Sequence, residues 1–158
     1  MLSLRMDHEG LESLPLKLLV VAVVASVSIV PASRALELFE NREFVLRAEA
    51  QIEQIVGEAQ RISINGPGNV RTLSIDLYSK SEVRFSRLTL GDREGGPNMS
   101  SAIIELSNGG RVVSSAEDFS LWIRTPTGNA LTTTSPIFDL RLSCILDGAS
   151  TCVVAEVL

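Results

Sequence analysis

The chain has 158 residues, 45% of them hydrophobic, which suits one domain with its own core and is too short for a large multidomain enzyme. Its 14 basic residues form no cluster and are outnumbered by 19 acidic ones, and this net charge of -5 argues against a nucleic-acid-binding protein. One histidine and two cysteines offer few ligands for a transition metal and no catalytic triad, so we expect no enzyme activity, no cofactor and no metal site.

A strongly apolar segment follows a short polar leader at residues 1–10. No residue from Leu18 to Ser33 carries a charge. The 20 residues from Leu14 to Ser33 would form a helix about 30 Å long at about 1.5 Å per residue, which matches the hydrocarbon core of a bilayer. We predict a transmembrane half-helix over 11–33. The alternatives are a buried core helix and a cleaved secretory signal.

A charged, amphipathic half-helix is predicted over residues 34–62. Its apolar residues recur at spacings of seven, three and four, and they form a heptad-like stripe of Leu38, Val45, Ala48, Ile52, Ile55, Ala59 and Ile62. The stripe can pack on the domain that follows, on neighbouring chains, or on both along its length. Pro31, between the two halves, removes a backbone donor and clashes with the preceding turn. We predict one long helix over 11–62, bent at Pro31, with two separate helices as the alternative.

From residue 63 onward, short β-type runs are separated by turn residues, beginning after Asn65-Gly66-Pro67-Gly68-Asn69. The predicted strands are 70–77, 83–90, 102–106, 111–114, 119–124, 130–134, 137–146 and 152–157. Asn108-Gly109-Gly110 predicts a hairpin turn, and a change of parity in the second run predicts a β-bulge near Ser86. The predicted fold class is α+β: a long bent N-terminal helix followed by a small antiparallel β-sandwich-like domain over 63–158.

Two cysteines flank the last predicted turn. If that turn is centred on Gly148, Cys144 and Cys152 lie directly opposite each other on paired strands, where a disulfide can close with little distortion. We predict this disulfide, and with it an oxidising, extracytoplasmic location. Two buried thiols are the alternative.

Asn98 is a candidate N-glycosylation site, because Asn98-Met99-Ser100 is an N-x-S acceptor beside Gly95-Gly96-Pro97 in a predicted exposed loop. Residues that support catalysis are scarce. His8 lies in the leader without a neighbouring pocket, and a surface enzyme would need a polar pocket formed by residues such as Glu105, Asp139, Arg141 and Asp147.

With its parts in this order, the chain resembles archaeal type IV pilin-like proteins, the group that includes adhesion pilins and archaellins. Gly10, followed by Leu11-Glu12-Ser13-Leu14-Pro15-Leu16-Lys17 and an apolar helix, is similar to a class III signal sequence. The resemblance implies that prepilin peptidase cuts between Gly10 and Leu11, with Glu12 as the second residue of the mature chain. Met1 and Met6 are both candidate start residues of the leader.

The resemblance implies a structural, non-enzymatic pilin-like subunit or minor pilin. It implies that the N-terminal helix contacts membrane lipid first and then copies of itself or related pilins, while residues 63–158 lie outside the cell. One alternative is a secreted binding domain, because Ser33-Arg34-Ala35 fits a signal peptidase site and residues 1–35 would then be removed. Another is a single-pass membrane protein that never assembles.

Overall fold

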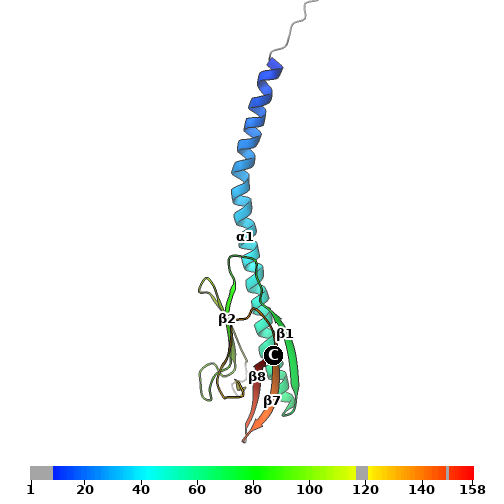
Figure 1. The fold of residues 1–158 in the computed structure, drawn as a ribbon, viewed down its shortest axis with the longest axis vertical. Coiled ribbons are helices and arrows are strands. Elements are labelled where there is room, and N and C mark those ends of the chain that lie inside the picture. The colour runs from blue at the N-terminus through cyan, green and yellow to red at the C-terminus, as the bar shows by residue number, and fades with distance from the viewer. Residues whose placement is uncertain (1–8, 117–120, 149) are drawn as a thin grey trace, which may run out of the picture. The chain divides into compact units, whose positions relative to one another are not determined.

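The computed structural model describes the backbone of residues 9–116, 121–148 and 150–158, and side chains from Leu16 onward. It shows one long N-terminal helix followed by two small, mostly antiparallel sheets, so the predicted α+β fold class is confirmed (Figure 1). The contacts divide the chain into two compact units, residues 1–39 and residues 40–158. The helix therefore contributes to both units, and its second half belongs with the sheets.

Helix α1 runs from Glu9 to Asn65, a little longer at each end than predicted. It is helical through Pro31, so the alternative of two separate helices is wrong, while the bend at Pro31 stays a prediction. Gly66 follows the helix with φ +87°, a left-handed conformation that terminates helices and favours glycine. The Asn69 side-chain amide donates to the carbonyls of Asn65 and Gly66 at 3.0 and 2.8 Å, which satisfies carbonyls at the helix end.

Eight strands in the described residues form two four-stranded sheets, with orders β1-β7-β8-β5 and β4-β3-β2-β6. Their bounds are β1 Val70–Asp76, β2 Phe85–Leu90, β3 Ser101–Leu106, β4 Arg111–Ser115, β5 Ile123–Arg124, β6 Leu131–Thr133, β7 Ile137–Asp147 and β8 Ser150–Val157. Each predicted run overlaps one of these strands, and β3, β4, β7 and β8 extend one or two residues beyond their predicted runs. Part of one run, residues 119–120, lies outside the described residues.

Strand pairing confirms two finer predictions and adds one feature. The register of β2 against β3 shifts between Phe85 and Arg87, which is the bulge predicted near Ser86. Strands β3 and β4 pair antiparallel across the Asn108-Gly109-Gly110 turn, as predicted. Strand β5, however, pairs with β8 in parallel, because the chain reaches this sheet edge from the other sheet rather than through a hairpin.

The described residues hold one hydrophobic core, built from the second half of α1 and both sheets. On the helix the buried residues are Phe44, Ala48, Ile52, Ile55, Val56, Ala59 and Ile62. The predicted stripe is therefore confirmed from Ala48 onward as packing on its own domain. At the start of the stripe Leu38 is 70% exposed, and Val45 is half-buried.

Side-chain amides attach α1 to the backbone around β1. The Gln51 amide donates to the Asp76 carbonyl at 3.0 Å and accepts from the Asp76 N–H at 3.1 Å. Asn41 Oδ1 accepts from the Val83 N–H at 3.2 Å, just before β2, which begins at Phe85 rather than at Val83 as predicted. Beside this face of α1, β1, β7 and β8 run along the helix (Figure 1).

Replacing Gln51 by alanine should lower the free energy of unfolding by about 1–2 kcal/mol, because its two hydrogen bonds to the backbone of Asp76 are lost. Urea denaturation followed by circular dichroism measures this change. Gln54→Ala is the matched control, since Gln54 is exposed on the same stretch of helix. Equal effects of the two substitutions would contradict the role given to Gln51.

Candidate functional site

In the first unit, α1 is apolar, and its side chains are exposed wherever the structure describes them. Every described side chain from Leu16 to Glu40 is exposed, and the large apolar ones between Leu16 and Val30 have exposed fractions of 52–69%. The most apolar 18-residue window of α1 has a mean hydropathy of 2.1, and none of it is buried. By length and composition, this helix can cross a membrane.

Three serines in this part of α1 are hydrogen-bonded to the helix itself. The hydroxyl groups of Ser26, Ser28 and Ser33 donate to the carbonyls of Val23, Val24 and Val30 at 2.9, 2.8 and 3.0 Å. A hydroxyl bonded to the preceding turn needs no water, so these serines are compatible with an apolar surrounding. The helix surface in this segment is therefore suited to lipid or to another apolar surface.

The proposed cleavage residues lie at the start of α1. Gly10, Leu11 and Glu12 are helical, but their side chains lie outside the described residues. Met1, Met6 and His8 lie outside the described backbone as well. Cleavage after Gly10 stays a prediction.

The two cysteines are not paired, and the predicted disulfide is wrong: both thiols are free and buried. Cys144 on β7 lies opposite Val153, and Cys152 on β8 lies opposite Ile145. Because neighbouring residues of a strand point to opposite faces, this offset of one residue places the two thiols on opposite faces of the sheet. Accordingly, Cys144 belongs to the hydrophobic core and Cys152 does not.

The turn between β7 and β8 explains the offset. Asp147 pairs with Ser150, so the loop between the strands has two residues, and Gly148 takes its first position with φ +61°. Two-residue hairpin loops favour glycine in this left-handed conformation. A turn centred on Gly148, as predicted, would instead pair Leu146 with Ser150 across a loop of three residues and shift every later pair by one residue.

Arg124 on β5 covers Cys152 on the face of the sheet opposite the core. Its Nε donates to Cys152 Sγ at 3.4 Å, its Nη2 lies 2.7 Å from Asp147 Oδ2, and its guanidinium carbon lies 4.9 Å from the centre of the Trp122 ring. The hydrogen bond to Cys152 raises the pKa of Arg124, which stays charged. Trp122 Nε1 also donates to the Asp92 carbonyl at 3.0 Å. These contacts stabilise the position of the short strand β5.

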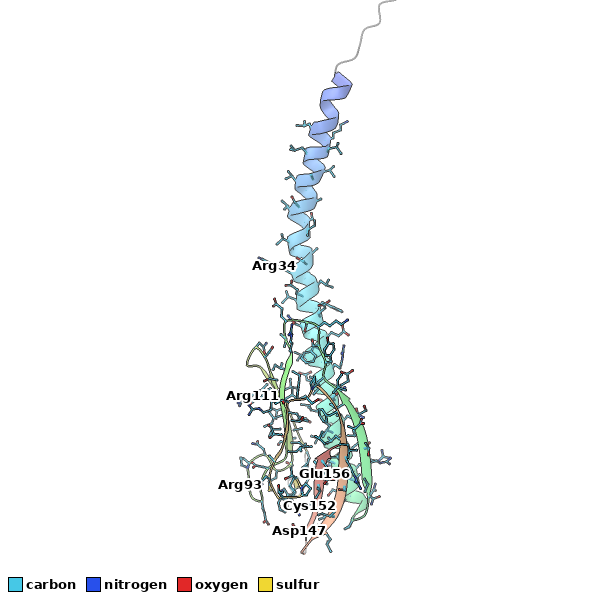
Figure 2. The ribbon with its side chains drawn as sticks, viewed as in Figure 1. Arg34, Arg93, Arg111, Asp147, Cys152 and Glu156 are labelled. Atoms are coloured by element: carbon cyan, nitrogen blue, oxygen red, sulfur yellow. The ribbon has the colours of Figure 1, made fainter. Side chains whose placement is uncertain are left out.

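Cys152 and Asp147 lie at the end of the β7–β8 hairpin (Figure 2). The Arg124 cluster itself was not predicted. Arg124 lies 23 residues before Asp147 and 28 residues before Cys152 in the chain, and no spacing rule links it to them.

Both thiols should resist alkylation in the folded protein. Cys144 and Cys152 have exposed fractions of 1% and 0%, and burial raises the pKa of Cys144, which keeps it in the less reactive thiol form. Intact mass after iodoacetamide treatment without reductant should show no adduct on native protein and two on urea-unfolded protein. If the unfolded chain reacted with iodoacetamide only after reduction, the statement that both thiols are free would be contradicted.

The polar residues named for a hypothetical enzyme do not converge. Glu105 on β3 lies 3.1 Å from Arg111 and 3.8 Å from Arg87, whereas Asp147 pairs with Arg124. Asp139 and Arg141 lie on β7, in the other sheet from Glu105. Among the residues that the structure describes, no group of three or more His, Cys, Asp or Glu side chains is placed to hold a metal ion.

The candidate glycosylation site is less open than predicted. Asn98 is half-buried, and its carbonyl accepts from the Ser101 N–H at 3.1 Å. Ser100 is 9% exposed, while Pro97 beside them is exposed. Asn98 stays a candidate acceptor on the loop that leads into β3.

Comparison with known proteins adds no relative: no family model, no curated protein and no solved structure matches this chain. Its function is therefore argued from its own residues. The exposed apolar part of α1 is the candidate functional surface.

Proposed function

We propose that this protein is a structural, non-enzymatic pilin-like subunit or minor pilin, anchored in the membrane by α1 before it assembles into a surface filament. Residues 11–33 would cross the bilayer once, and residues 63–158 would lie outside the cytoplasm. Prepilin peptidase would cut a class III signal peptide between Gly10 and Leu11. The partners are then membrane lipid, the peptidase, and copies of this chain or related pilins.

The observation that carries this proposal is the apolar segment of α1, none of which is buried. At about 25 cal/mol per Å² of apolar surface, leaving such a segment in water is costly, so it must contact lipid or other apolar helices. The hydrophobic core of the domain does not bury this segment. Every buried apolar side chain in the described residues comes from Phe44 or later, so the domain core is complete without the segment.

The resemblance to archaeal pilin-like proteins supplies the assembly step. A membrane anchor that never assembles accounts for the exposed apolar helix equally well. So does a secretory signal, because the apolar segment would then be cut off and absent from the mature protein. The alternative function is therefore a secreted or membrane-anchored cell-surface binding domain that does not assemble. Because both thiols are free, a disulfide no longer supports an extracytoplasmic location. The support for this location is then the apolar helix and the resemblance.

The mature N-terminus tests the proposal directly. Mass spectrometry of membrane and shed-surface fractions should find chains that start at Leu11, and Gly10→Val should leave the leader attached. A start near Leu36 would replace the pilin proposal with an exported binding domain. An uncut leader in a chain that stays in the membrane would favour the plain anchor.

Assembly is tested separately from processing. Sheared surface material should contain the protein in sedimentable polymers, and these polymers should disappear in the Gly10→Val variant. Protein that starts at Leu11 but remains monomeric in the membrane would contradict the filament.

A further inference from the structure

An open pocket of about 250 Å³ lies between α1 and the segment that connects β1 to β2. Its helical wall is formed by residues 40, 43, 44 and 47, which the helical repeat places on one face. The opposite wall is formed by residues 78–81. Phe44, 2% exposed, and Tyr78, 51% exposed, supply apolar surface within this otherwise polar lining.

The connecting segment is attached to α1 at both ends. Before it, the Gln51 amide bonds to the N–H and the carbonyl of Asp76, and after it, Asn41 accepts from the Val83 N–H at 3.2 Å. Within it, the hydroxyl oxygens of Ser79 and Ser81 lie 2.6 Å apart. A wall restrained in this way loses little conformational freedom when a ligand binds.

The pocket is lined by charged side chains of both signs. Glu43 and Arg47 form an ion pair at 3.3 Å. Glu40 on the helix and Lys80 on the segment have no ion-pair partner among the described residues. A ligand with a single charge would leave one of these two unmatched, whereas a zwitterion can pair with both.

We propose that this pocket binds a small α-amino acid with an apolar side chain. The ammonium group pairs with Glu40, the carboxylate with Lys80, and the side chain packs against Phe44 and Tyr78. The volume limits the ligand to about the size of leucine, because drug-sized ligands fill pockets of about 300–1,000 Å³. This site does not depend on membrane anchoring or on assembly.

Equilibrium dialysis of radiolabelled leucine against the full chain in detergent tests the proposal. Leucine should bind saturably, with one molecule per chain, and Glu40→Gln and Lys80→Met should each weaken binding at least about tenfold. Leucinamide, which lacks the carboxylate, and N-acetylleucine, which lacks the ammonium group, should compete at least about tenfold less well than leucine.

Glu53→Gln is the matched control, because Glu53 is exposed on the same helix and does not line the pocket. Its affinity for leucine should equal that of the unchanged protein, and thermal unfolding should be the same for all three variants. Absence of saturable binding would overturn the proposal. So would equal competition by leucinamide and leucine, or binding that survives in both pocket variants.

Discussion

The double substitution Val20→Arg/Val24→Arg is expected to release the protein from membranes. Both valines are more than half exposed within the apolar segment, so neither substitution disturbs the domain core. An arginine near the centre of a spanning helix costs about 2.5–3.5 kcal/mol on the insertion scale, so two cost about 5–7 kcal/mol. Alkaline carbonate extraction of membranes should then recover the variant in the supernatant, whereas the unchanged protein stays in the pellet.

Leu38→Arg is the matched control for this experiment. Leu38 is 70% exposed on the same helix but lies beyond the predicted span of 11–33, so its substitution should leave the protein in the pellet. Release by Leu38→Arg as well would show that the membrane contact extends past the predicted span. Retention of the double variant would contradict the transmembrane anchor.

Replacing Gly91 by alanine is expected to destabilise the domain by at least about 3 kcal/mol. Gly91 has φ +69°, and a Cβ there would overlap the carbonyl oxygen of Ile123 on β5. Backbone cannot move aside as a flexible side chain can, so β5 would have to shift and the hydrogen bond from Gly91 N–H to the Ser101 carbonyl would be strained. Urea denaturation measures the free energy of unfolding.

Gly95→Ala separates the overlap from the effect of backbone conformation. Gly95 has φ +73°, but a Cβ there meets nothing within 4 Å. Its substitution should therefore cost only the conformational part, about 1 kcal/mol. Similar losses for Gly91→Ala and Gly95→Ala would contradict the close approach of β5 to the loop after β2.

Most elements could be predicted from the sequence because the evidence for them is local. Period-two runs such as Val70–Leu77 and turn residues such as Asn108-Gly109-Gly110 mark strands and hairpins, and the parity change beside Ser86 marks a bulge, without reference to the rest of the chain. The stripe from Ala48 to Ile62 likewise marks a helix face that must be buried. The sequence could not decide whether the following domain or another chain buries it.

The predicted disulfide was wrong because the local sequence pattern does not fix the register of the two strands. The positions of Cys144 and Cys152 relative to each other depend on whether the turn at Gly148 has two or three residues, and both lengths suit this sequence. A change of one residue transfers a side chain to the other face of the sheet. The contacts of Arg124 with Cys152 and Asp147 also depend on the parallel pairing of β5 with β8, which joins segments far apart in the chain.

The sequence by itself determined the apolar segment, the helix that contains it, the eight strand regions and the α+β class, because each depends on residues within a few turns or pleats of one another. Only the tertiary structure decided the strand register, the free thiols, the cover of the helical stripe and the pocket between Glu40 and Lys80. These features join residues distant in sequence. The free energy of these contacts depends on which faces of the helix and the sheets pack together in the folded chain.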